Sequence, residues 1–374
     1  MNTIKQLIEK YCPDGVEYKK LGEVCTFQRG TSLTSKNAIE GDIPVISGGQ
    51  KPAFYHNVAN REANSITVAG SGAYAGYVSF WNKPIFAADC FTVNPDCSIL
   101  LIKYVYHYLL NIQEKIYGTK KGAGVPHVHG KDIAKFLIPV PPLPVQHEIV
   151  RILDNFTSLE TELEAELKAR RKQYEYYRDQ LLSFKHLSGG TDEVEWKTLP
   201  QISQNLDSKR KPIKSSRRVA GMYPYYGASG IVDYVEDYIF DGDFLLVSED
   251  GANLLARTSK IAFSISGKNW VNNHAHVLSF NDAVRRKFVE FYIENLDLSR
   301  YISAGAQPKL TKDKLNSIPI PQPPYEKQQK IVSILDRFES LVNDISTGLP
   351  AEIAARHQQY EYYRDQLLSF KRRS

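Results

Sequence analysis

Two short stretches of the chain combine residue types that could carry out methyl transfer. The glycines of AGSGAYAG, from Ala69 to Gly76, follow a strand-like run and would let a backbone approach a phosphate or the methionine part of S-adenosylmethionine. The stretch QPPY, from Gln322 to Tyr325, differs in one residue from the Asn/Asp-Pro-Pro-Tyr motif that binds the target amine in amino-methyltransferases.

The residues around both stretches favour structural roles. YVSFW follows Gly76 and is a strand pattern, whereas a phosphate or cofactor loop needs the N-terminus of a helix there, so a tight hairpin is expected. The chain has VPPL at the position in its first half that corresponds to QPPY in its second half, which indicates a strap between a domain and a helix. We therefore expect no catalytic residue in this chain.

Patterns typical of nucleases, metal sites and ATPases are incomplete. EYK at Glu17 and EWK at Glu195 have the Glu-x-Lys spacing of a metal-dependent nuclease strand, but neither has an upstream Pro-Asp partner, which favours solvated edge strands. HVH at His127 and HAH at His274 lack an evident third ligand, so no metal site is expected. No GxxxxGK[ST] loop is present, and ATP hydrolysis is not supported.

Basic clusters are the best candidates for a functional surface. DSKRKPIKSSRR, from Asp207 to Arg218, and YGTKKGAG, from Tyr117 to Gly124, are loop-like, and such loops can neutralise DNA phosphates and reach guanine edges. The alternative for each cluster is a solvated surface loop. The candidate DNA-binding residues are Lys120, Lys121, Lys131, Lys209, Arg210, Lys211, Lys214, Arg217 and Arg218.

Composition indicates a globular protein of two or three domains. The chain has 374 residues, of which 42% are hydrophobic and 24% charged, with a net charge of +5 and a pI near 8.7. Its four cysteines form no CxxC pair, which argues against a zinc ribbon or a disulfide framework. No apolar run is long enough for a membrane span and no signal peptide is evident, so a cytoplasmic location without membrane association is expected.

An internal duplication organises the chain. QYEYYRDQLLSFK, from Gln173 to Lys185, recurs without change from Gln359 to Lys371. IVRILDNF from Ile149 corresponds to IVSILDRF from Ile331, and each follows a Pro-rich strap. The order of elements is therefore A-B-A'-B', with whole modules duplicated.

The two B segments have apolar residues at alternating spacings of three and four, which predicts long helices with a coiled-coil seam. Each helix is expected to begin sharply after its strap, the first at Ile149, and to find its simplest partner in the other. The second copy carries four extra residues in the neighbourhood of STGLP, Ser346 to Pro350, which predicts a kink or short interruption there. Candidate seam and partner-docking residues are Tyr174, Tyr177, Leu181, Phe184, Tyr360, Tyr363, Leu367 and Phe370.

The A segments show mixed α/β patterns, and the fold class expected is α+β. Short apolar or alternating runs bounded by Gly, Asn and Pro predict strands, and the segments 103–116 and 286–296 predict amphipathic helices. The predicted domains are a first α/β module with its Pro-rich strap over 1–148, a helix over 149–186, a second module with its strap over 187–330 and a second helix over 331–374.

With these motifs in this order, the chain resembles the specificity subunit of a type I restriction-modification system over essentially its full length. The resemblance rests on VEYKKLGEV and VEWKTLPQI at the module starts, IPxP at the module ends and the IVxILDxF and QYEYYRDQLLSFK helices, in this order. STGLP departs from that pattern.

The resemblance implies a non-catalytic subunit with two target-recognition domains, each of which reads half of a bipartite double-stranded DNA site. It implies an antiparallel pair of helices as the spacer, with two methyltransferase subunits docked on it and restriction subunits as possible further partners. S-adenosylmethionine, ATP and Mg would then be bound by the partners, and this chain would hold no cofactor. Two other interpretations stay open: a stand-alone methyltransferase or nuclease, and a structural coiled-coil protein without a DNA role.

Overall fold

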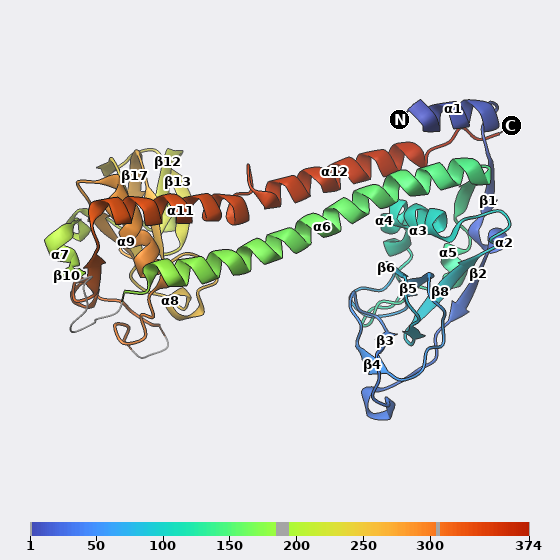
Figure 1. The fold of residues 1–374 in the computed structure, drawn as a ribbon, viewed down its shortest axis with the longest axis horizontal. Helices are drawn as coiled ribbons and strands as arrows, with labels where there is room; N and C mark the ends of the chain where they lie inside the picture. The colour runs from blue at the N-terminus through green and yellow to red at the C-terminus, as the bar shows by residue number, and fades with distance from the viewer. Residues whose placement is uncertain (1, 185–193, 304–306, 374) are drawn as a thin grey trace. The chain divides into compact units, whose positions relative to one another are not determined.

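The computed structural model describes residues 2–184, 194–303 and 307–373. The chain divides into two compact units, Met1–Glu164 with Glu352–Ser374, and Ala165–Ala351 (Figure 1). Each unit combines one A module with parts of the long helices. The module limits expected at residues 148 and 330 stay predictions, because each compact unit also includes part of the long helices and its limits therefore differ in kind from those of a module. Lys185, the last residue of the first thirteen-residue copy, lies outside the described residues.

The first unit contains three small sheets. β1 pairs antiparallel with β9, a four-stranded sheet has the order β2-β8-β5-β6, and a three-stranded sheet has the order β4-β3-β7. The strands are β1 (Glu17–Lys20), β2 (Cys25–Arg29), β3 (Ile43–Ile46), β4 (Phe54–His56), β5 (Ser65–Ala69), β6 (Val78–Trp81), β7 (Phe86–Ala87), β8 (Cys90–Pro95) and β9 (Leu137–Val140).

Helices pack around these sheets and enclose a large apolar core, which includes Ile66, Tyr104 and Ile138. The helices are α1 (Asn2–Tyr11), α2 (Leu21–Val24), α3 (Ile102–Asn111), α4 (Gln113–Tyr117), α5 (Gly130–Ile133), the first part of α6 (Leu143–Leu182) and most of α12 (Leu349–Leu367). The helix expected over 103–116 is thus two helices that meet at Ile112.

The second unit repeats this plan. β10 pairs antiparallel with β19, a four-stranded sheet has the order β11-β18-β15-β16, and a further sheet has the order β13-β12-β17-β14. The strands are β10 (Glu195–Thr198), β11 (Gln204–Asn205), β12 (Ala220–Gly227), β13 (Gly230–Val235), β14 (Phe240–Asp241), β15 (Phe244–Ser248), β16 (Ala262–Ile265), β17 (Lys268–Val271), β18 (Ala275–Ser279) and β19 (Pro319–Gln322). The helices are α7 (Leu199–Ile202), α8 (Asn253–Ala256), α9 (Ala283–Asn295), α10 (Lys312–Asn316), α11 (Tyr325–Asn343) and the rest of α6; the short 3-10 turns are η2 (Asp207–Lys209) and η3 (Ser215–Arg217). The mixed α+β class expected from the sequence is confirmed.

The first long helix begins earlier than expected, at Leu143 rather than Ile149. Pro144 lies in its first turn, where the backbone N–H has no partner within the helix in any case, so proline is compatible with the helix start. The expectation that the Pro-rich strap keeps residues before Ile149 out of the helix was therefore wrong. The last helical residue of this copy is Leu182.

The second long helix is interrupted, as STGLP predicted. α11 ends at Asn343 and α12 begins at Leu349. The carboxylate of Asp344 accepts hydrogen bonds from the Ser346 N–H at 2.7 Å and the Thr347 hydroxyl at 2.6 Å, which stabilises the break. A side chain at Gly348 would place its Cβ 2.5 Å from the Ser340 carbonyl oxygen, so glycine is required there.

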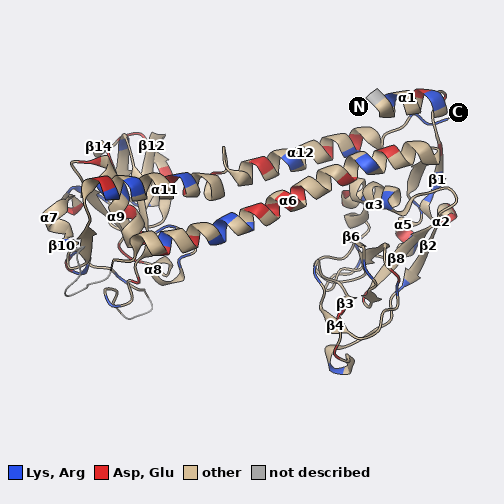
Figure 2. Cartoon of the chain, in the orientation of Figure 1, with Lys and Arg blue, Asp and Glu red and all other residues tan. Residues whose placement is uncertain are grey.

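Within each unit the helical segments run antiparallel and use equivalent aromatic residues. In the first unit Phe156 stacks on Tyr363 with ring centroids 5.2 Å apart, and His357 lies 2.9 Å from Glu160. In the second unit Tyr177 stacks on Phe338, the counterpart of Phe156, at 5.8 Å. Figure 2 shows Lys, Arg, Asp and Glu mixed along α6, which therefore presents no continuous basic stripe. Among the described helices, none is both long and apolar enough to cross a membrane.

Candidate nucleic-acid interface

The two four-stranded sheets have the same register, so positions in one module can be matched to the other. Val68 pairs with Phe91 across β5 and β8, and Val247 pairs with His276 across β15 and β18. Phe91 also pairs with Arg29. Asp207 follows β11 at the position that matches Arg29, because β2 and β11 run along β8 and β18 in the same register.

The backbone at the ends of β5 and β15 forms the same hydrogen bonds in both modules. The Gly70 N–H donates to the Asp89 carbonyl at 3.1 Å, and the Glu249 N–H donates to the His274 carbonyl at 2.9 Å. The carbonyl oxygens of Gly70 and Glu249 also accept matching backbone hydrogen bonds. The Val128 N–H donates to Gly70 at 3.0 Å, and the Leu310 N–H donates to Glu249 at 2.7 Å. The two modules thus build one backbone site and fill it with different side chains.

In the first module this site is an open cavity of about 270 Å³. Gly70 contributes no side chain, and a Cβ there would lie 3.3 Å from Asp89 Oδ1. The rings of His127 and His129 are almost parallel, with centroids 6.3 Å apart and planes inclined by 6°. The polar lining residues are Arg29, Asp89, His127, His129 and Lys131.

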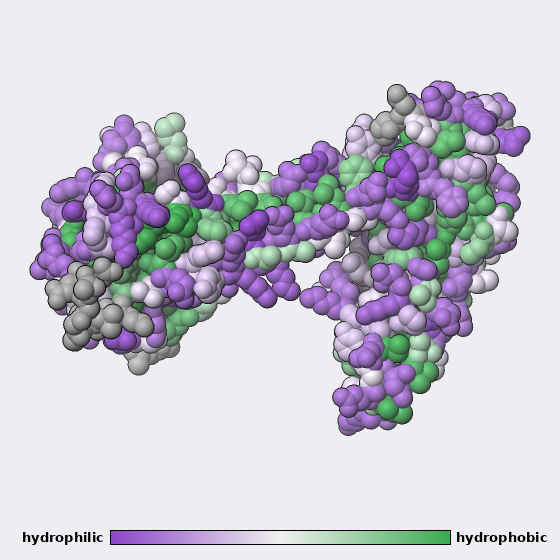
Figure 3. Space-filling view, viewed as in Figure 1, coloured by the Kyte–Doolittle hydropathy of each residue, from purple (hydrophilic) through white to green (hydrophobic). Residues whose placement is uncertain are grey.

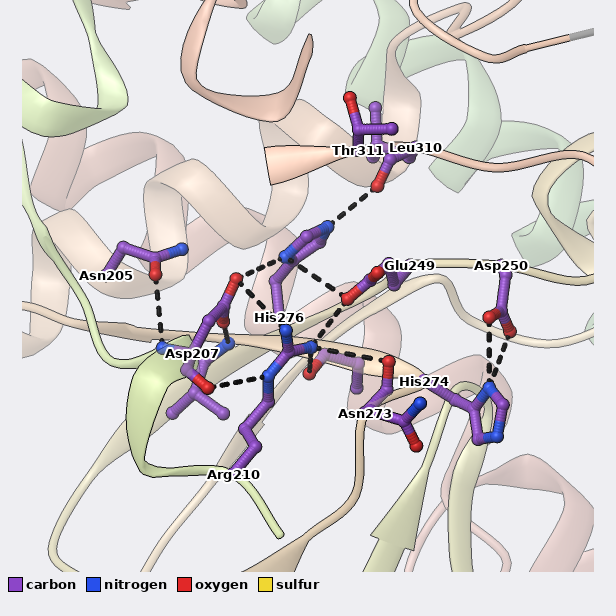
Figure 4. A network of polar contacts seen from close by, with 12 residues as sticks. Asn205, Asp207, Arg210, Glu249, Asp250, Asn273, His274, His276, Leu310 and Thr311 are labelled. Carbon is purple, nitrogen blue, oxygen red and sulfur yellow. Dashed lines mark hydrogen bonds and ion pairs between the residues drawn. The ribbon is translucent and has the colours of Figure 1, made fainter. Parts of the chain in front are cut away.

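In the second module the matching position is filled by a network of ion pairs (Figure 4). His276 has Nδ1 2.6 Å from a carboxylate oxygen of Asp207 and Nε2 2.8 Å from the Leu310 carbonyl oxygen. Both ring nitrogens face oxygen atoms, so the two contacts hold the ring between Asp207 and the segment at Leu310. The Arg210 guanidinium lies 2.6 Å from Glu249 and 2.8 Å from the Ala275 carbonyl oxygen.

The carboxylates of this network are held in their charged form. Burial alone would raise the pKa of Asp207, but the hydrogen bond from His276 and the charge of Arg210 keep that pKa below its usual value. Burial acts in the same direction on Glu249, and Arg210, His276 and Lys309 lower its pKa overall. The network fixes the start of the basic segment 207–218 to the sheet.

Asp207, Glu249 and His276 also have ligand atoms within 4.8 Å of one another, a spacing that a metal ion could use. Arg210 already pairs with both carboxylates, at 2.6 Å from Glu249 and 3.5 Å from Asp207. The cluster therefore balances its charge with protein groups and supports no metal proposal. The two histidines of HAH do not act together, because His274 pairs with Asp250 and His276 with Asp207.

The nine basic candidates fall into two groups. Four side chains have partners within the protein: Lys120 over the Tyr117 ring, Lys121 with Asp132, Arg210 with Asp207 and Glu249, and Arg218 with Asp233 and the Tyr225 ring. The other five are exposed and form no ion pair with the described residues: Lys131, Lys209, Lys211, Lys214 and Arg217. Arg210 is 13% exposed and acts as an internal ion-pair partner rather than a free cation. DNA contact by any of the nine stays a prediction.

The motifs that could have indicated an enzyme have structural roles. Ala69–Gly76 connects β5 to β6 in an antiparallel hairpin, as expected, with positive φ at Gly72 and Gly76. The EYK and EWK stretches lie in β1 and β10, where each lysine pairs with its neighbouring glutamate. Tyr325 of QPPY opens α11 and donates a hydrogen bond to Asp282 at 2.9 Å.

The repeated helix sequence presents matching residues in both units. Tyr360 and Leu367 are buried, and Tyr174 and Leu181, their counterparts, are half-buried. Tyr363 and Tyr177 stack as described above, and Phe370 and Phe184 pack against the apolar clusters of their units. These eight seam candidates therefore face the protein interior to different degrees, and partner docking by them stays a prediction.

The outward face of the repeated sequence is also the same in both units. Tyr176 and Tyr362 are each 61% exposed, and each lies edge-on to the following tyrosine with ring centroids 5.4 Å apart. This face is formed by exposed residues at helical spacings of one, three or four positions. They are Glu175, Tyr176, Asp179, Gln180 and Ser183, and in the second copy Glu361, Tyr362, Asp365, Gln366 and Ser369. We call this set the outward strip.

Beside one copy of the outward strip lies an apolar groove of about 530 Å³ in the second unit. Its lining includes Leu181 and Phe184 from the end of the first helix and Lys330, Ile331 and Ile334 from α11. Figure 3 shows hydrophobic side chains exposed over α11.

Sequence reasoning missed the residues that the site brings together, notably Arg29, Asp89, Glu249 and Asp250. The sequence contained one signal for these residues. AGSG (69–72) and SEDG (248–251) lie at the ends of matching strands, and AAD (87–89) and NNH (272–274) lie before the next matching strands. Polar residues therefore recur at the same strand ends in both modules.

Comparisons with known proteins agree with this duplicated architecture. A family model described as type I restriction modification DNA specificity domain matches residues 13–170 and 191–355. The specificity subunit of the type I restriction enzyme EcoR124I/EcoR124II of Escherichia coli is 33% identical over 95% of this chain and 94% of its own length. A Haemophilus influenzae protein named as a type I restriction enzyme specificity subunit is 42% identical over 47% of this chain, which spans 46% of that protein. The crystal structure of a type I restriction-modification system S subunit from M. genitalium has a TM-score of 0.69 over 95% of this chain and 96% of that one, at 20% identity, which shows a shared fold.

Proposed function

The chain belongs to the family of type I restriction-modification DNA specificity proteins, and from this premise we propose that it selects the DNA sequence on which a modification complex acts. Each module reads one half of a bipartite double-stranded site, and the long helices set the gap between the halves. The chain itself carries out no catalysis. A cytoplasmic location is part of this proposal, since the chain would act on cellular DNA.

One observation carries the proposal: the modules share a backbone site but not its side chains, whereas the repeated helices share both. In the first module the site is lined by Asp89 and Arg29, and in the second by His274 and Asp207. Different side chains on one backbone suit the reading of two different sequences, since bases are distinguished by their hydrogen-bonding groups.

The outward strip is proposed as the docking surface for two methyltransferase subunits, one on each copy. An identical set of exposed side chains presents the same contacts twice, and exposed tyrosines such as Tyr176 and Tyr362 are well suited to anchor an interface. The apolar groove beside Leu181 and Ile331 extends this surface in the second unit. Restriction subunits would join the same complex. S-adenosylmethionine, ATP and Mg²⁺ would be bound by these partners.

DNA binding is proposed to rest on the exposed cations of the basic segment, Lys209, Lys211, Lys214 and Arg217, together with Lys131 of the first module. Each phosphate that a cation neutralises adds about −0.9 to the slope of log K against log salt concentration. Replacing Lys214 and Arg217 by methionine should therefore weaken binding and reduce that slope by about 1.8. Lys5→Met with Lys10→Met, which removes the same charge from the exposed face of α1, is the matched control.

The first test of the function is single-molecule mapping of methylated adenines in host DNA with the gene present and deleted. Loss of a split motif, two short defined halves around an undefined gap, supports the specificity role. An unchanged methylation pattern in a host that expresses the methyltransferase partner, together with no salt-dependent DNA binding by the purified complex, would contradict it.

A further inference from the structure

The most informative feature beyond the general function is the residue immediately before β8 and before β18. Asp89 precedes β8 and His274 precedes β18, and the carbonyl of each accepts the matching backbone hydrogen bond from Gly70 or Glu249. The backbone places these two side chains at matching positions, so the two modules differ there in the chemical group that they present, a carboxylate in one and an imidazole in the other.

In both modules a second side chain, also at a matching position, holds this group. The Ser71 hydroxyl donates a hydrogen bond to Oδ2 of Asp89. Asp250, the counterpart of Ser71, has its two carboxylate oxygens 2.9 and 3.0 Å from Nδ1 of His274 (Figure 4). In each module a neighbouring side chain thus holds one polar atom of the Asp89 or His274 side chain in place, and the other polar atom can contact a ligand. Such a held side chain suits ligand recognition.

The available side of Asp89 is a hydrogen-bond acceptor. Within the part of the chain that the structure describes, Asp89 Oδ1 accepts no hydrogen bond, and Asp89 lines the open cavity together with Arg29 and Lys131. In the second module the equivalent of the cavity is filled by Glu249 and its pair with Arg210. His274 is 51% exposed there, and its Nε2 is the ring nitrogen that does not face Asp250.

We infer that Asp89 and His274 are base-reading residues, one for each half of the DNA site, and that Asp89 selects cytosine. This inference rests on the proposed function and names a substrate group for it. A carboxylate accepts a hydrogen bond from the N4 amino group of cytosine in the major groove. Guanine and thymine present acceptors at that edge, which repel a carboxylate. Adenine presents an amino donor, but the lone pair of its neighbouring N7 disfavours a carboxylate placed beside it.

The cations around the cavity fit this role. Arg29 and Lys131 are exposed, and Lys131 has no ion-pair partner among the described residues. Cations that line the cavity can hold backbone phosphates while the carboxylate reads a base edge, which separates positioning contacts from specifying ones. The nearby rings of His127 and His129 contribute further polar and apolar surface.

The test uses the chain in complex with its methyltransferase subunits and maps methylated sites for Asp89→Asn and Asp89→Ala. At one position of one half-site, the wild-type complex should require cytosine. Asp89→Asn should accept adenine there, because an amide pairs with both N6 and N7, and Asp89→Ala should accept several bases. Discrimination at that position should fall about 10- to 100-fold, with the other half-site and the gap unchanged.

Asp96→Asn is the matched control. Asp96 follows the opposite end of β8, where it accepts hydrogen bonds from Ser98, so the variant makes the same chemical change outside the cavity. It should leave the motif unaltered. His274→Ala supplies the reciprocal case and should relax a position in the other half-site only.

The outcomes separate the inference from the function beneath it. A wild-type complex that methylates no split motif refutes the proposed function itself. A wild-type motif retained by Asp89→Asn with undiminished selectivity overturns the inference, and so does a uniform loss of affinity for all four bases at every position, which would assign Asp89 a purely structural role. Direct binding to four DNA duplexes that differ only at the assigned position distinguishes these results without requiring methylation.

Discussion

Arg210 and Lys211 are neighbours in one basic run, and the structure predicts opposite consequences for their replacement. The Arg210 side chain is 13% exposed and pairs with Glu249, which is 12% exposed, and with Asp207, which is 6% exposed. Lys211 is exposed and has no ion-pair partner in the described part of the chain. Arg210→Met keeps most of the side-chain volume and removes the charge, so it isolates the ion pairs.

The cost of Arg210→Met follows from the groups left behind. Removing one partner of a buried ion pair costs about 3–5 kcal/mol, because the other charge is left buried without compensation. Here His276 and Lys309 still offset part of the carboxylate charge, at 2.6 Å from Asp207 and 3.1 Å from Glu249. We therefore expect about 3 kcal/mol, at the lower end of that range, which corresponds to a local opening equilibrium about 100 times larger.

Hydrogen exchange of the full chain measures this opening directly. Amides of the segment 207–218 and of β18 should exchange about 100-fold faster in Arg210→Met than in the natural sequence. In Lys211→Met they should change by about twofold at most, since surface substitutions stay within about 0.5 kcal/mol. Lys211→Met should instead reduce the salt slope of DNA binding by about 0.9. Unchanged protection in Arg210→Met would refute the assignment of Arg210 to the internal network.

The same network predicts a direction for the dependence of stability on pH. The pKa values of Asp207 and Glu249 lie below the ordinary values of 3.8 and 4.5. Their contribution to the free energy of unfolding is therefore complete above those ordinary values and is lost as the pH falls through the lowered values of the folded state. In Arg210→Met acid unfolding, followed by near-ultraviolet circular dichroism, should begin at a higher pH, because one of the charges that lower both pKa values is gone.

Two further predictions concern groups that the sequence treats as equivalent. Tyr360→Phe removes a hydrogen bond of 3.1 Å between the Tyr360 hydroxyl and buried His107 and should cost about 1–2 kcal/mol in denaturant unfolding. The Tyr174 hydroxyl has no hydrogen-bond partner among the described residues, so Tyr174→Phe should change stability by less than about 0.5 kcal/mol. Equal costs for the two variants would contradict this reasoning. Burial raises the pKa of the Cys90 thiol to about 12, so iodoacetamide at neutral pH should label exposed Cys97 and leave Cys90 unmodified in the native chain, and rapid labelling of Cys90 would contradict its burial.

The strongest sequence signals were those repeated along the chain or set by local geometry. The exact recurrence of QYEYYRDQLLSFK predicted two matching helical segments, and the ring pairs Phe156–Tyr363 and Tyr177–Phe338 show that one aromatic contact recurs in both units. The break near Gly348 was also predictable, because proline and glycine act on the backbone next to them. The start of the first helix was not, since a proline in the first turn is compatible with helix and the sequence pattern did not show which turn would be first.

The sequence by itself determined that the chain is duplicated, that its modules are mixed α/β units and that its helices repeat one surface, because these features depend on local propensity and on identity along the chain. Only the tertiary structure decided which polar residues form the site. Asp89 and Lys131 line one cavity, and Asp207 and His276 form an ion pair, because the tertiary fold brings distant segments to the same sheet end. It also decided which cations are free, since an ion pair such as that of Arg210 with Glu249 joins residues far apart in sequence, and charge composition carries no information about such a partner.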